Sequence, residues 1–134
     1  MARRDDRTVT THCKWAAGKR FLLRTYVASE KEHPDVPSRT GLQIIGWDPA
    51  SRQIRSWTFD STGGHGQGLW TRADGGWTIE SEGVLADGSP TTSTELIERV
   101  SDNIIGWQSI NRTVGGQPLP DTEQVVLERV PAKP

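Results

Sequence analysis

The chain has 134 residues, a length that usually makes one domain. Its 16 basic and 17 acidic side chains give a formal net charge of -1, which argues against nucleic acid as a partner because nucleic-acid-binding domains normally carry a strong basic excess. No apolar run approaches the roughly 18 residues of a membrane-spanning helix, so we expect no membrane as a partner either.

Turn signals divide the chain into short segments that have the alternating, β-branched and aromatic composition of strands. In chain order, the expected strands are residues 8–15, 20–29, 40–47, 53–61, 67–72, 77–85, 91–100, 104–114 and 123–130. The clearest turns between them are residues 48–51, where Asp48 and Pro49 suit a type I turn, and residues 73–76, Ala-Asp-Gly-Gly. Residues 94–101 would also suit a helix, but Pro90 and the Ser and Thr residues that follow it favour a strand.

Evenly spaced hairpins through the whole chain indicate an antiparallel meander, and closure into a barrel removes the exposed edges of such a sheet. We therefore predict an all-β fold, a single antiparallel up-and-down barrel of about eight or nine strands with little or no helix. The interior of such a barrel is filled by side chains or holds one small ligand. The barrel domain is expected to span residues 7–130, with residues 1–6 as a disordered tail and residues 131–134 as a C-terminal tail.

Cysteine usage and the N-terminal sequence bear on the compartment. The single cysteine, Cys13, leaves no internal disulfide, and the charged N-terminal residues are followed by no apolar stretch that would make a secretory signal. We therefore expect a cytoplasmic protein. Cys13 shares a strand face with Val9, Thr11 and Trp15, which predicts a small core residue and not a reactive thiol.

Tryptophan is the unusual component, because the chain has 6 Trp but only 2 Phe and 1 Tyr. Residues 44–47, Ile-Ile-Gly-Trp, recur as residues 104–107, and Gly76 and Trp77 lie between the two copies. A glycine in a strand permits a kink or a close approach, as a barrel corner needs, and a large neighbouring ring can cover the gap. This structural interpretation is favoured over a ring of tryptophans around a ligand.

A longer pattern resembles a known domain. It comprises residues 46–49, 54–61, 68–72, Trp77 and 87–88, followed by residues 107–109 and 111–116. The pattern is similar to the calycin-type, lipocalin-like barrel domain of bacterial proteins of unknown function, a domain often found after a SnoaL-like domain. The resemblance covers residues 9–129 and implies the barrel fold, with no settled activity.

The usual opening strand of that domain is absent, which implies either a gapped barrel or a homodimer that closes it. The glycine-tryptophan signature and proximal histidine of haem-binding calycins are also absent, so no haem or other cofactor is expected.

The titratable residues offer a few candidates for chemistry. His12, His33 and His65 have no metal-ligand spacing, so no metal site is expected. His65 lies in a glycine-rich loop that could place an imidazole at a barrel mouth, whereas His12 is expected on the outer face and His33 in a solvated loop.

Asp60 shares a strand face with Ile54 and is a candidate acid/base residue. Glu80 joins it only if its face points inward, because Trp77 and Ile79 on the core side would leave Glu80 and Glu82 solvated. The role of four arginines also depends on which face of their strand points inward, because an inward arginine could bind an anionic ligand. They are Arg24, Arg55, Arg72 and Arg112.

Three functions compete. The preferred one is a small-molecule binding barrel for a partly apolar ligand, and its expected wall and orienting residues are Trp47, Trp57, Trp70, Trp107, Gln108 and Arg112. The first alternative is a cofactor-free enzyme, an isomerase, cyclase or hydrolase, with Asp60 and Glu80 as acid/base residues and His65 at the mouth. The second alternative is a structural or interaction module whose barrel is filled.

Overall fold

The structure is a computed structural model that describes residues 7–30, 32 and 37–130. These residues form ten strands and no helix. The strands are β1 (Arg7–Ala16), β2 (Phe21–Glu30), β3 (Pro37–Asp48), β4 (Gln53–Asp60), β5 (His65–Ala73), β6 (Gly76–Val84), β7 (Pro90–Arg99), β8 (Ile104–Val114), β9 (Gln117–Leu119) and β10 (Val125–Glu128). Within the same residues no helical segment has the length and apolar character that a membrane crossing requires. The predicted tails at 1–6 and 131–134, and the loop residue His33, lie outside the described residues.

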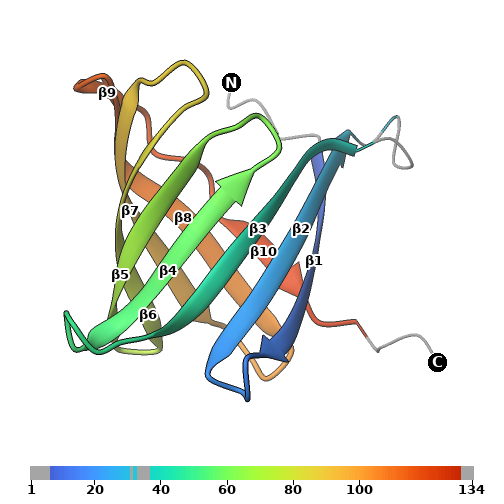
Figure 1. The fold of residues 1–134 in the computed structure, drawn as a ribbon. Helices are drawn as coiled ribbons and strands as arrows, with labels where there is room; N and C mark the ends of the chain where they lie inside the picture. The colour runs from blue at the N-terminus through green and yellow to red at the C-terminus, as the bar shows by residue number, and fades with distance from the viewer. Residues whose placement is uncertain (1–6, 31, 33–36, 131–134) are drawn as a thin grey trace.

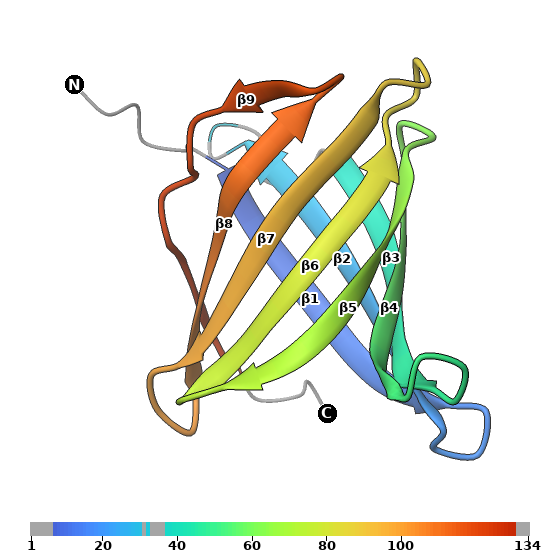
Figure 2. The same ribbon diagram turned by 90° about the vertical axis from the view of Figure 1, so that its left-hand side faces the viewer.

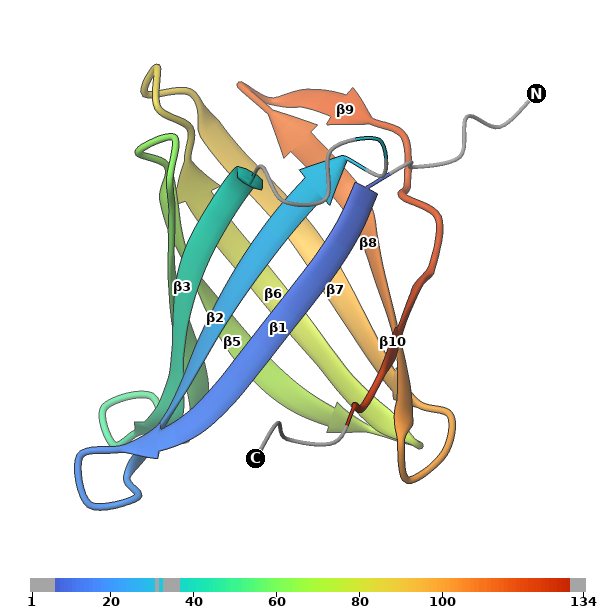
Figure 3. The ribbon, with the colours of Figure 1, turned by 90° about the vertical axis from the view of Figure 1, so that its right-hand side faces the viewer.

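All strands belong to one antiparallel sheet in which β1 to β8 pair in chain order (Figure 1). This confirms the all-β, up-and-down prediction, including the choice of strand over helix at residues 94–99, which are part of β7. The C-terminal segment pairs with the far edge of β8 in two pieces, β9 at one end (Figure 2) and β10 at the other (Figure 3). Because β9 carries Pro118 and Pro120 follows it, this last edge cannot form one continuous ladder.

The sheet curls so that β1, β2 and β3 face β5 to β8 across an interior, giving a barrel-like shape (Figures 1 and 3). Among the described residues no ladder joins β1 to β8 or β10, so the sheet is not closed by hydrogen bonds. A gapped barrel was one of the two arrangements left open by the sequence; closure by a second copy stays a prediction.

Strand register identifies the face that points inward. Residues paired across neighbouring strands share a face, and residues next to each other in one strand lie on opposite faces. The guanidinium of Arg24 in β2 lies 4.5 Å from the ring centroid of Trp107 in β8. These two strands are not neighbours in the sheet, so the two side chains meet across the interior. Every residue in register with Arg24 or Trp107 therefore faces inward.

The packed core is small. Among the described residues only two apolar residues are buried, Ala28 and Ile79. Inward-facing side chains such as Arg24 and Trp107 are only half-buried. Cys13 corrects the expectation of a small core residue, because it faces inward beside Arg24 and is nevertheless exposed.

Apolar side chains also cover part of the outer face. They lie on β2, β3 and β4 and are Phe21, Leu23, Leu42, Ile44, Trp57 and Phe59. Phe21 and Trp57 pack edge to face with their ring centroids 6.4 Å apart. A Cβ on Gly46 would collide with the Phe21 ring, so this glycine admits a ring from the neighbouring strand. The covering ring is not that of Trp47, because adjacent residues of a strand lie on opposite faces.

Candidate functional site

The inner wall of β5 to β8 carries a continuous row of aromatic and aliphatic side chains. Trp77, Ile97 and Trp107 occupy successive positions across β6, β7 and β8. Trp70 packs edge-on against Trp77 at a centroid distance of 5.9 Å and donates its indole N–H to Ser56 at 2.9 Å. The row therefore offers a fixed aromatic surface to whatever enters the interior.

Glu95 organises the polar end of this row. Its carboxylate accepts a hydrogen bond from Nε1 of Trp107 at 2.7 Å. The hydroxyls of Ser93 and Ser109 donate to its Oε1 at 2.8 and 3.0 Å. All four residues face inward on β7 and β8. Three donors on one carboxylate hold both that group and the indole plane of Trp107 in place.

Arg24 reaches this cluster from the opposite wall. Its neighbours in register are uncharged polar or thiol side chains, Cys13 on β1 and Gln43 on β3. Within the described part of the chain, no carboxylate lies within 4.0 Å of its guanidinium. Burial lowers the pKa of Arg24, against the opposing influence of Cys13 and Tyr26. The side chain remains a cation that lies over the ring of Trp107.

The tryptophans expected to line the wall divide between the two faces. Trp70 and Trp107 face inward, as does Trp47, which lies at the end of β3 and is 56% exposed. Trp57 corrects the expectation, because it lies on the outer face next to the inward-facing Ser56. The alternation of β4 thus places its largest aromatic residues outside.

Gln108 and Arg112, expected to orient a ligand, contact the C-terminal segment instead. Gln108 lies on the outer face and donates to the carbonyl of Thr122 at 3.1 Å. Arg112 donates to the carbonyl of Pro120 at 3.2 Å. Both side chains hold the C-terminal segment along the edge of β8. The outward position of Gln108 corrects its expected role, whereas the role expected of Arg112 stays a prediction.

The three acid/base candidates do not come together. His65 begins β5 on the outer face, where its exposed ring lies 6.4 Å from that of Phe59. Glu80 is exposed on the outer face and accepts a hydrogen bond from Thr94 at 3.1 Å. Ile79 faces inward and is only 2% exposed. Glu80 and Glu82 therefore lie on the opposite, solvated face of β6. The described residues also contain no cluster of His, Cys, Asp and Glu that could hold a metal ion.

Asp60, the third candidate, stabilises the turn between β4 and β5. Its carboxylate accepts hydrogen bonds from the backbone N–H groups of Thr62 and Gly64 at 2.9 and 3.2 Å and pairs with Arg39 at 3.0 Å. Burial alone would raise the pKa of Asp60, but hydrogen bonds from Thr62 and Arg39 outweigh it and lower the pKa to about 2. Such a carboxylate stays ionised at neutral pH and its oxygens are already occupied.

These contacts of the Asp60 carboxylate make the free energy of unfolding depend on pH in the acidic range. The pKa of Asp60 is lower in the folded chain than the value of about 3.9 in an unfolded chain, so its contribution is complete above about pH 4 and is lost as the pH falls towards 2. We expect a loss of about 2 kcal/mol over that interval, absent in Asp60→Asn. Urea unfolding followed by tryptophan fluorescence at several pH values measures it. Asp74→Asn, in an exposed turn, is the matched control and should keep the wild-type pH dependence.

Sequence reasoning named Arg24 only as one of four arginines and did not select Glu95. Of those four, Arg24 and Arg72 face inward by register, but Arg72 is exposed whereas Arg24 is half-buried against Trp107. Arg55 lies outside and pairs with Asp48 at 2.8 Å. The feature of the sequence that could have singled out Arg24 is its position between Leu22 and Tyr26 on one strand face. The corresponding feature for Glu95 is the alternation Ser93, Glu95, Ile97, which places a carboxylate in a row of otherwise small or apolar side chains.

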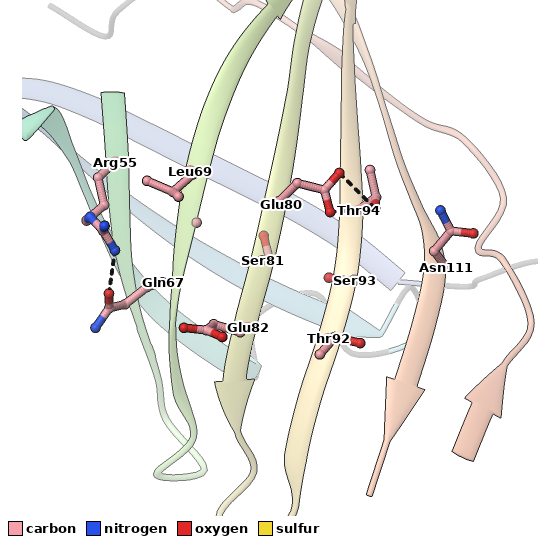
Figure 4. A pocket seen from close by; sticks show the side chains of 11 residues that line it. Arg55, Gln67, Leu69, Glu80, Ser81, Glu82, Thr92, Ser93, Thr94 and Asn111 are labelled. Carbon is pink, nitrogen blue, oxygen red and sulfur yellow. Dashed lines mark hydrogen bonds between the residues drawn. The ribbon is translucent and has the colours of Figure 1, made fainter. Parts of the chain in front are cut away.

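A concave region lies on the outer face of β4 to β8 (Figure 4). This open depression measures about 520 Å³ and is lined by polar and charged side chains that include Arg55, Gln67, Glu80 and Glu82. Arg55 and Gln67 are hydrogen-bonded to each other at 2.7 Å. Leu69 is the sole large apolar side chain on its lining, so the depression lacks the apolar surface of a typical ligand site.

The fold and the inner wall define a small, all-β, barrel-like protein with an aromatic and polar interior. No protein-family model matches the chain, and a search of curated proteins finds no relative.

Proposed function

We propose that the chain is a binding protein whose interior takes up one small, partly apolar molecule. The observation that carries the proposal is the inner wall itself: Trp70, Trp77 and Trp107 face inward and remain only half-buried. A filled barrel would bury such side chains, since protein cores are close-packed. The interior of a barrel of about eight strands has room for a single small ligand.

Two further points support this proposal over its alternatives. The acid/base candidates lie on different faces or are engaged in a turn, so no observation favours an enzyme built on Asp60, His65 and Glu80. The similarity of residues 46–88 to calycin-type barrel domains also agrees with a ligand-holding interior. Polar groups fixed on an aromatic wall are what small-molecule sites use to orient a ligand.

Binding can be tested with phenylnaphthylamine, an uncharged fluorophore whose emission rises in apolar surroundings. We expect wild-type protein to bind it, and Trp107→Leu to weaken the affinity about tenfold, because burial of one aromatic face is worth on the order of 1.5 kcal/mol. Trp57→Leu is the matched control, since it removes a half-buried tryptophan from the outer face. Its affinity for the fluorophore should stay near that of wild type.

A second pair of variants fills space instead of removing it. Thr58→Trp adds bulk to the interior, whereas Thr71→Trp adds the same bulk to the exposed outer face. The proposal requires the first variant to lose the fluorophore and the second to retain it, with melting temperatures showing that both fold. Equal binding by both variants, or a loss confined to Trp57→Leu, would mean that the fluorophore sits on the outer apolar face and would contradict the proposal.

A further inference from the structure

Arg24 is a cation that the protein itself does not neutralise within the described residues. Buried or half-buried charges in proteins are normally paired, because leaving water costs them hydration. Two other inward-facing arginines have carboxylate partners, since Arg39 pairs with Asp60 and Arg99 pairs with Asp102. Arg72, in register with Trp77, also faces inward but is exposed, so its charge stays in water. Arg24 instead has the flat face of Trp107 on one side and only neutral neighbours in register. Its planar fork of N–H donors is therefore available to an anion.

Glu95 does not fill that role, although it lies in the same cluster. It is not within 4.0 Å of Arg24, and three donors already occupy its oxygens. Its effect on Arg24 is indirect: by holding Nε1 of Trp107 it fixes the indole plane on which the guanidinium stacks. An arginine whose plane is fixed by stacking loses little entropy when it forms two parallel hydrogen bonds.

We propose that the ligand of the interior carries a carboxylate that binds Arg24, with its apolar body lying along Trp107, Ile97 and Trp77. This inference rests on the proposed binding function and narrows it to organic carboxylates. A carboxylate matches the guanidinium fork in a bidentate pair, which is stronger and more directional than a neutral hydrogen bond. The apolar row starts at Trp107, the residue that Arg24 stacks on, so one molecule can reach both.

The charges of the interior favour a carboxylate over a phosphate ester. A phosphate monoester brings a charge near -2, and phosphate sites usually supply several cations or backbone N–H groups. Here the guanidinium of Arg24 stands in the same cluster as the ionisable group of Glu95. A single negative charge is balanced by Arg24, whereas a second would be repelled by the Glu95 carboxylate.

The test compares naphthoate with its uncharged amide, naphthamide, by isothermal titration calorimetry. The two probes share one apolar body, so their affinity ratio isolates the carboxylate. We expect wild-type protein to prefer naphthoate by roughly tenfold to a hundredfold, the range of a charge-assisted pair. Arg24→Gln should reduce this ratio to near one, and Arg24→Lys should leave it intermediate because lysine keeps the charge but not the fork. Arg55→Gln, on the outer face, should leave the ratio unchanged.

The outcomes separate this inference from the function on which it rests. If wild-type protein binds phenylnaphthylamine but shows no preference for naphthoate, the carboxylate assignment is overturned and the binding function stands. The assignment is equally overturned if the preference survives in Arg24→Gln or if naphthyl phosphate binds more tightly than naphthoate. Failure of the wild-type protein to bind phenylnaphthylamine or either naphthalene probe overturns both. If Arg24→Gln does not fold, the ratio of naphthoate to naphthamide affinity in wild type and in Arg24→Lys still tests the carboxylate assignment.

Discussion

Replacing Gly76 by alanine is expected to destabilise the protein by about 4 kcal/mol, at the upper end of what single substitutions do. A Cβ at this position would overlap the backbone carbonyl of Ile97 on the neighbouring strand. A side chain could move aside, but Ile97 is held in the β6–β7 ladder next to Glu98, the pairing partner of Gly76. Relief of the overlap therefore requires separation of two paired strands.

The neighbouring Gly75 is the natural control, because it is required for another reason. It occupies the tight turn before β6 with φ of 76°, and no atom lies within 4 Å of a Cβ built on it. Gly75→Ala should cost only about 1 kcal/mol, the price of a left-handed conformation for an L-residue. Urea unfolding followed by tryptophan fluorescence compares the two variants. A Gly76→Ala protein as stable as Gly75→Ala would show that β6 and β7 separate there at little cost.

The strand pattern was predictable because turn chemistry is local. Gly75 in a two-residue turn and Asp48, whose carboxylate accepts the backbone N–H of Ala50 at 2.9 Å, fix hairpins without reference to the rest of the chain. The nine expected segments therefore fall on observed strands. The exception is β9, three residues with Pro118 at their centre, whose composition predicts a loop and whose pairing depends on the end of β8.

The inward face was not predictable by hydrophobicity, since both faces carry apolar residues. On β4, Ser56 and Thr58 face inward while Trp57 and Phe59 face outward, the reverse of the usual rule. Only a contact across the interior, such as that of Arg24 with Trp107, resolves the two faces. Residue spacing within a strand says which side chains share a face, but not which face is enclosed.

The candidate site depends on the same long-range information. Arg24 and Glu95 come from β2 and β7, on opposite walls of the interior, and no spacing rule connects them. Gln108 and Arg112 have side chains suited to a ligand, yet the C-terminal segment returns to β8 and uses both. Chemical type alone therefore does not identify which residues converge.

Truncating Glu95 to alanine is expected to lower the free energy of unfolding by about 3 kcal/mol. The change leaves Nε1 of Trp107 and the hydroxyls of Ser93 and Ser109 without their acceptor, and each loss is worth about 1 kcal/mol. It also releases the indole plane that supports Arg24, so naphthoate affinity should fall together with stability. Urea unfolding and calorimetry measure the two losses on one preparation.

Two comparisons make the Glu95 result specific. Glu82→Ala removes an exposed outer carboxylate and should change stability by no more than about 0.5 kcal/mol. Trp107→Phe keeps an aromatic ring but removes the N–H donor, so a double-mutant cycle with Glu95→Ala should give a coupling of about 1 kcal/mol. Additive effects would mean that water replaces Glu95 at the indole without loss. In that case the carboxylate does not fix Trp107, and Arg24 must be positioned by its own strand alone.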